Sequence, residues 1–141
     1  MSKVAVVYWS MTGNTEAMAN AVADGAKATG AEVDIMTSAE FGVDKMGEYD
    51  AVGFGCPAMG DEVLEEEEFE PMFTACEGSL SGKKIALFGS YDWGDGEWMR
   101  LWEERCKKAG ANMACDFVIC NLEPDTEAVE SCKALGAALV K

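Results

Sequence analysis

The sequence contains no histidine in its 141 residues, so it lacks the side chain that most often exchanges protons near neutral pH. Catalysis by Ser-His-Asp or Cys-His arrangements, metal ligation by histidine and a histidine pH switch are therefore excluded. The six cysteines include no C-x-x-C pair, so the patterns of zinc ribbons, thioredoxins and ferredoxins are absent. We interpret these cysteines as small buried hydrophobic side chains of a protein in a reducing cytoplasm.

Positive charge and long hydrophobic runs are also scarce. Eleven Lys and Arg stand against 26 Asp and Glu, which gives a net charge of −15. Such a surface repels nucleic-acid phosphates and anionic lipids, so we expect no nucleic-acid or membrane partner and expect protein partners to be basic. The apolar run at residues 4–9 is far shorter than the roughly 20 residues of a membrane span, and no signal-peptide pattern precedes it. These features predict a cytoplasmic protein.

The chain does contain a regular alternation of short apolar segments and amphipathic segments. Strands are predicted over residues 3–9, 32–37, 50–56, 84–90 and 112–120, and most are hydrophobic at consecutive positions, as strands buried on both faces are. Helices are predicted over residues 15–29, 97–109 and 126–141, and one more begins near 68–71; residues 39–48 form a weak segment. We therefore predict one α/β domain over residues 1–141, with a three-layer, doubly wound, five-stranded parallel sheet.

In such a sheet, ligands bind beyond the carboxyl ends of the strands, where the direction of winding reverses. The loop after the first strand contains Ser10, Met11, Thr12, Gly13, Asn14 and Thr15. Its hydroxyls and backbone N–H groups, at the start of a helix, suit a phosphate group. Unlike a nucleotide-binding P-loop it has no lysine. Taken alone, the same residues are also explained as caps of the following helix.

Two further loops follow the third and fourth strands. The first contains Pro57, Ala58, Met59, Gly60, Asp61 and Glu62, in which an apolar side chain beside a glycine suits contact with a flat ring. The acidic residues 65–68 that follow are interpreted as a solvated face near a helix start.

The loop after the fourth strand contains Ser90, Tyr91, Asp92, Trp93 and Gly94. Its aromatic side chains lie among turn-forming residues, so Trp93 is either a stacking surface or a cover on the core edge. We assign Trp98 and Trp102 to the core.

Together the three loops resemble those of the flavodoxins, specifically the short-chain clostridial type. The resemblance is carried by residues 7–10, 12–16, 58–62, 88–91 and 93–96, and it extends over essentially the whole chain. It implies the flavodoxin strand order, 2-1-3-4-5, and non-covalently bound FMN as the cofactor. Met11 and Asp92 depart from it, because glycine is common at both positions in close relatives; Asp92 would add negative charge beside the flavin edge.

The resemblance implies a role for each matching position. The phosphate would be held by the side chains of Ser10, Thr12, Asn14 and Thr15 and by the N–H groups of residues 10–15, joined by the Ser90 hydroxyl. Met59 would lie against the inner face of the flavin ring, and Trp93 would stack on its outer face.

The edge of the flavin ring would meet the other two loops. Glu62 would accept the flavin N3–H, and backbone groups of residues 91–94 would meet the pyrimidine edge. A peptide at Met59 or its neighbour would turn toward the flavin N5 on one-electron reduction, a change that Gly60 tolerates because it has no Cβ.

The function implied by this resemblance is that of a low-potential one-electron carrier rather than an enzyme. It would shuttle between the neutral semiquinone and the hydroquinone of FMN and, as a monomer, pass electrons to basic redox proteins. One alternative is an FMN-dependent NAD(P)H or quinone reductase, but the sequence shows no basic patch near the loops and no long insertion to form a nicotinamide pocket. A second is a non-redox acidic interaction module, which leaves the pairing of Met59 with Trp93 unexplained.

Overall fold

The computed structural model describes residues 2–11, 13–59, 63–92 and 94–140. Its elements are β1 (Lys3–Tyr8), α1 (Asn14–Ala28), β2 (Glu32–Thr37), the 3-10 helix η1 (Val43–Glu48), β3 (Ala51–Gly55), α2 (Phe69–Glu77), β4 (Lys84–Tyr91), α3 (Glu97–Lys108), β5 (Asn112–Met113), β6 (Val118–Asn121) and α4 (Thr126–Val140). The strands form one parallel sheet in the order β2-β1-β3-β4-β5, and β6 also pairs with β4. The predicted α/β fold and strand order are therefore confirmed.

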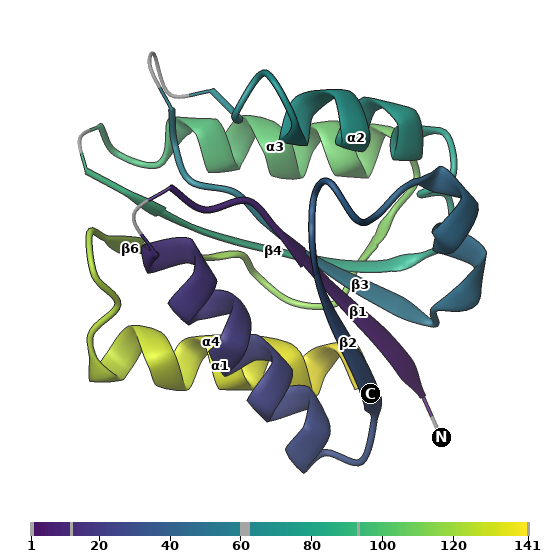
Figure 1. Cartoon of the computed structure of the whole chain (residues 1–141), viewed down its shortest axis with the longest axis horizontal. Helices are drawn as coiled ribbons and strands as arrows, with labels where there is room; N and C mark the ends of the chain where they lie inside the picture. The colour runs from purple at the N-terminus through teal and green to yellow at the C-terminus, as the bar shows by residue number, and fades with distance from the viewer. Residues whose placement is uncertain (1, 12, 60–62, 93, 141) are drawn as a thin grey trace.

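Helices cover both faces of the sheet, as Figure 1 shows: α2 and α3 lie on one side, and α1 and α4 on the other. Neighbouring residues of β1 point to opposite sides. Ala5 and Val7 pack into the cluster formed with α2 and α3, whereas Val4 and Val6 pack into the cluster formed with α1 and α4. Because both faces are covered, each central strand needs apolar residues at consecutive positions, which is the pattern that predicted it.

The two layers of helices are packed differently. On the α2–α3 face the core is aromatic, and Trp98 and Trp102 are each 2% exposed, which confirms their assignment to the core. On the other face, α1 and α4 cross so closely that a Cβ at Gly136 would collide with the Val22 carbonyl oxygen and lie 2.9 Å from the Ala26 nitrogen. Residues without a Cβ therefore set the distance between α1 and α4.

The fifth predicted strand, residues 112–120, is present as two short strands on the same edge of β4. Five residue steps separate Met113 from Val118, but their partners on β4, Ile85 and Phe88, are only three steps apart. The two additional residues bulge out and interrupt the pairing. The predicted helix boundaries agree with the structure to within about two residues, the usual uncertainty for helix ends. Within the described residues, no helix is long and apolar enough to span a membrane.

Candidate functional site

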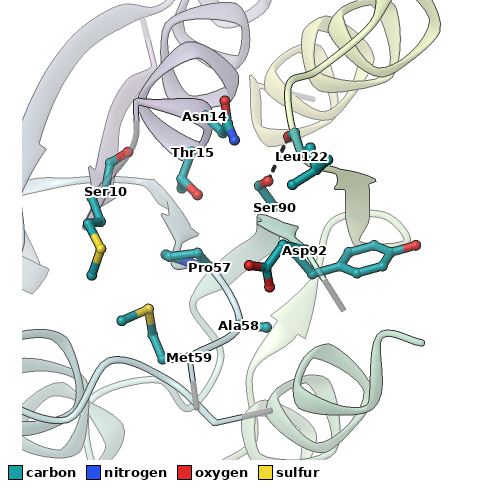
Figure 2. A pocket seen from close by; sticks show the side chains of 11 residues that line it. Ser10, Asn14, Thr15, Pro57, Ala58, Met59, Ser90, Asp92 and Leu122 are labelled. Atoms are coloured by element: carbon teal, nitrogen blue, oxygen red, sulfur yellow. Dashed lines mark hydrogen bonds between the residues drawn. The ribbon is translucent and has the colours of Figure 1, made fainter. Parts of the chain in front are cut away.

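A cavity of about 270 Å³ lies where β1, β3 and β4 end, and Figure 2 shows it from close by. All three loops predicted to bind a ligand contribute to its lining, which consists of Ser10, Met11, Asn14, Thr15, Pro57, Ala58, Met59, Ser90, Tyr91, Asp92 and Leu122. Gly13 and Gly94, also predicted, are outside this lining. Thr12, Gly60, Asp61, Glu62 and Trp93 lie outside the described residues. The fold thus brings together residues from positions 10 to 122 at the predicted edge of the sheet.

The first loop ends at a glycine that starts helix α1. Gly13 has a left-handed backbone (φ 95°), a conformation that costs glycine little, and α1 begins at the next residue. The Ser10 Oγ accepts hydrogen bonds from the N–H groups of Gly13, at 3.1 Å, and Glu16, at 3.3 Å. The capping interpretation of this loop therefore holds for Ser10, which satisfies two N–H groups at the start of the helix.

Thr15, in the first turn of α1, is in a different situation. Its side chain points into the cavity in Figure 2, and the residue is only 1% exposed. Its Oγ1 has no hydrogen-bond partner in the part of the chain that the structure describes. Ser38 Oγ and Trp102 Nε1 are likewise buried without a partner among the described residues, but of the three residues Thr15 is the one that lines this cavity. Leaving a buried hydroxyl unpaired costs roughly 1–3 kcal/mol, and a polar group of a ligand in the cavity would remove that cost.

The described residues of the lining also lack positively charged side chains. None of its eleven residues is Lys or Arg, while the carboxylate of Asp92 faces the cavity. An anionic group at the Thr15 end would therefore be held by hydroxyls and by the N-terminus of α1 rather than by a cationic side chain. The donor set fits a phosphate ester, and the remaining lining of proline, alanine and methionine side chains fits an apolar ring.

The loop after β3 is held from three directions. Cys56 donates its N–H to the Phe88 carbonyl, at 3.2 Å, and accepts a hydrogen bond from Trp98 Nε1 on its own carbonyl, at 3.1 Å. The Ala58 N–H donates to the Ser90 carbonyl at 3.1 Å. Met59 and Val63 exchange two backbone hydrogen bonds, of 2.8 and 3.0 Å. These bonds fix the apolar Met59 side chain at the margin of the cavity (Figure 2).

The acidic segment after this loop corrects one interpretation from the sequence. Glu66, Glu67 and Glu68 are exposed, but Glu65 is buried, with 7% of its surface exposed. Its carboxylate accepts hydrogen bonds from the N–H groups of Glu67, Glu68 and Phe69 at 2.7–2.8 Å. Burial alone would raise the pKa of Glu65, but these three bonds outweigh it and lower the pKa. Glu65 therefore caps the start of α2 instead of belonging to a solvated face.

Leu122 was missed in reading the sequence, although it lines the cavity. Its N–H donates to the Tyr91 carbonyl at 2.7 Å, and its carbonyl accepts from Ser90 Oγ at 2.7 Å (Figure 2). The β4–β6 pairing brings residue 122 beside residues 90 and 91. Because the predicted strand ended at residue 120 with no functional motif after it, only the register of that pairing identifies Leu122 as part of the site.

Comparisons with known proteins bear on this arrangement. The family model described as flavodoxin matches residues 6–136. The chain is 46% identical to a flavodoxin from Megasphaera elsdenii, with 98% of each chain covered, and 47% identical to one from Clostridium beijerinckii, with 93% and 94% covered. The solution structure of the two-electron reduced Megasphaera elsdenii flavodoxin superposes with a TM-score of 0.90 over 97% of this chain and 98% of that one.

This chain belongs to the flavodoxin family. Flavodoxins are electron-transfer flavoproteins rather than enzymes; they bind FMN and act as redox carriers with protein partners. The resemblance read from the three loops is thereby confirmed, and FMN is the cofactor of the chain. The unpaired Thr15 hydroxyl, the start of α1 and the apolar lining fit the phosphate and the ring of FMN.

Proposed function

We propose that this cavity holds FMN non-covalently, with the phosphate at the N-terminus of α1. Ser10, Met11, Thr12, Gly13, Asn14 and Thr15 form the phosphate-binding loop in this proposal. The observation that carries it is the buried, unpaired Oγ1 of Thr15, which lies in the cavity lining within the first turn of that helix. A phosphate oxygen would give this hydroxyl the partner that the described residues do not.

The remaining assignments follow the loops. Pro57, Ala58 and Met59 lie against the flavin ring, and Ser90, Tyr91, Asp92 and Gly94 meet the cofactor from the other side. Gly60, Asp61, Glu62 and Trp93 complete the set on the strength of the resemblance alone. Because the Met59 N–H and carbonyl are both bonded to Val63, we assign the reorientation expected in this loop to a peptide beyond Met59.

We further propose that the chain carries single electrons at low potential, between the neutral semiquinone and the hydroquinone of FMN. When bound, FMN supplies the redox chemistry, and the protein shifts the relative stability of its oxidation states. An acid about 12 Å from the anionic reduced flavin opposes it by roughly 0.3–1.4 kcal/mol for effective dielectric constants of ~80 to ~20. Since ~1.4 kcal/mol corresponds to about 59 mV for one electron, several acids lower the second potential by roughly one to a few hundred millivolts.

The partners and the setting belong to the same proposal. A net charge of −15 favours basic redox proteins as transient donors and acceptors. All six cysteines are free thiols, which is consistent with a reducing cytoplasm. One sheet runs through the described residues, which supports a single FMN-binding domain over residues 1–141. We propose that this domain acts as a monomer.

A reductive titration of the purified protein, followed by absorbance, tests the proposal. We expect a yellow protein that gives a near-stoichiometric blue neutral semiquinone before full reduction, with negligible oxidation of NAD(P)H. Rapid two-electron oxidation of NAD(P)H would instead indicate a reductase. A protein that does not take up FMN would overturn the assignment of the cavity.

A further inference from the structure

We infer that Ser90 offers the cofactor only a hydrogen-bond acceptor, and that Leu122 is the positioning residue that imposes this. Ser90 would then accept a hydrogen bond from a hydroxyl of the ribityl chain. The resemblance implied a different role, in which the Ser90 hydroxyl contacts the phosphate. The inference rests on the proposed function, because it assumes that FMN occupies the cavity. It adds Leu122 to the residues that govern cofactor recognition.

The direction of the Ser90 hydroxyl follows from its neighbour. Ser90 Oγ lies 2.7 Å from the Leu122 carbonyl oxygen, and a carbonyl can only accept. The single hydroxyl hydrogen is therefore committed to Leu122, and what Ser90 retains for the cavity is lone pairs. The residue is 4% exposed and lines the cavity (Figure 2). A phosphate dianion has no hydrogen to donate to such a group, whereas ribityl hydroxyls do.

The backbone of Leu122 is built to hold that carbonyl in place. Leu122 is the one non-glycine residue with a positive φ, 59°, among the residues that the structure describes. A residue with a Cβ adopts this left-handed conformation rarely, so it persists only where surrounding contacts enforce it. Here the Leu122 N–H and Asn121 Nδ2 both donate to the Tyr91 carbonyl, at 2.7 and 3.1 Å. These two bonds pin the turn to β4, next to Ser90.

Thr15, on the α1 side of the cavity, offers the complementary hydrogen-bonding capacity. Thr15 Oγ1 is buried without a partner in the described part of the chain, so its hydrogen is available to an anionic oxygen. The Asp92 carboxylate, which also faces the cavity, is acceptor-only like Ser90. The lining therefore offers a donor from α1 and acceptors from β4 and the loop after it, a set that suits a ligand with both an anionic group and hydroxyl or N–H donors.

Three flavins distinguish a hydroxyl that contacts the ribityl chain from one that contacts the phosphate. They are FMN; riboflavin, which lacks the phosphate; and lumiflavin, which lacks both the phosphate and the ribityl chain. Their affinities for the apoprotein are measured by quenching of flavin fluorescence. For Ser90→Ala we expect FMN and riboflavin to bind about fivefold more weakly, by the same factor, and lumiflavin to bind unchanged. For the comparison variant Thr15→Val we expect the affinity for FMN to fall about tenfold and the affinities for riboflavin and lumiflavin to stay unchanged.

A second pair of variants tests Leu122 itself. Both Leu122→Gly and Leu122→Val remove the leucine side chain from the cavity lining, but only glycine keeps easy access to a positive φ. Relative to Leu122→Gly, we therefore expect Leu122→Val to bind FMN and riboflavin about fivefold more weakly, by the same factor, and to bind lumiflavin equally. Loss of affinity for FMN but not riboflavin in Ser90→Ala, or no loss for either, overturns the inference, as does equal behaviour of the two Leu122 variants. The proposed cavity fails separately, if the parent protein binds no FMN.

Discussion

Thr15 and Glu65 are both buried polar residues near the edge of the sheet that carries the cavity, but their surroundings differ. The Glu65 carboxylate accepts three backbone hydrogen bonds, whereas Thr15 Oγ1 has no partner among the described residues. A satisfied buried group stabilises the fold, and an unpaired one destabilises the protein until a ligand arrives. Because Thr15 also lines the cavity, its unpaired hydroxyl is accessible to a ligand, whereas the Glu65 carboxylate is already paired within the fold.

Removing the Thr15 hydroxyl should have effects of opposite sign on stability and on binding. Thr15→Val removes the unpaired hydroxyl while keeping the shape of the side chain. We expect the apoprotein to be as stable as the parent or more stable by up to about 1 kcal/mol, while its affinity for FMN falls about tenfold. Urea denaturation of the apoprotein and FMN titration measure the two quantities. A destabilised apoprotein with parental affinity would contradict the role given to Thr15.

For Glu65 the prediction concerns acid stability. Its pKa is lowered from about 4.5, so the contribution of its carboxylate is present above that pH and is lost as the pH falls through the lowered value. Glu65→Gln should therefore destabilise the protein by about 1–2 kcal/mol at pH 7, the usual loss for a helix cap, and by less below pH 4. Urea denaturation at both pH values provides the test. Glu66→Gln, at an exposed neighbour, is the control and should match the parent at both.

At the scale of elements, the crossing of α1 and α4 depends on the absence of side-chain atoms. A Cβ at Gly25 would meet the Lys133 backbone, and one at Gly136 would meet the Val22 backbone. Backbone atoms cannot move aside as the end of a flexible side chain can. The two helices therefore lie close together, and their position bears on the site because α1 also carries Thr15 at its start.

Replacing one of these glycines tests the close contact. Gly136→Ala should lower the free energy of unfolding by about 1–3 kcal/mol, the usual cost of overpacking a buried contact. Gly78→Ala is the matched control, because Gly78 has an ordinary helical backbone with nothing within 4 Å of a built Cβ. It should leave the protein as stable or more stable by about 0.4–1 kcal/mol. Urea denaturation compares the two; equal effects would mean that the crossing tolerates a Cβ.

At the scale of the whole molecule, the dominant feature is a net charge of −15. This negative charge destabilises the anionic reduced form of the cofactor, which lowers its reduction potential. The same charge attracts basic proteins and so favours their association with this chain. The lining of the cavity holds no Lys or Arg among its described residues, so the site does not reverse this field locally.

Salt should therefore slow electron transfer to a basic acceptor. We expect the second-order rate constant for oxidation of the reduced protein by a basic haem protein to fall about tenfold between ~10 and ~150 mM ionic strength, as the Debye length shortens from about 30 to 8 Å. Stopped-flow absorbance follows the reaction, and an acidic acceptor serves as the control, whose rate should rise instead. A rate with the basic acceptor that does not depend on salt would contradict electrostatic steering.

The strands, the helices, the layers and the three loops of the site could be predicted from the amino-acid sequence, because hydrophobic periodicity and turn-forming residues act locally. The sequence also correctly placed Trp98 and Trp102 in the core for the same reason. Three features emerge only once the chain is folded: Glu65 caps α2 while its acidic neighbours remain in solvent, the last strand is interrupted, and Leu122 joins the cavity. The interruption of the strand and the position of Leu122 depend on strand register, which is set by contacts between residues distant in the chain. The hydrogen bonds of Glu65 are local, but which of several similar glutamates becomes buried is decided by the packing of the assembled fold.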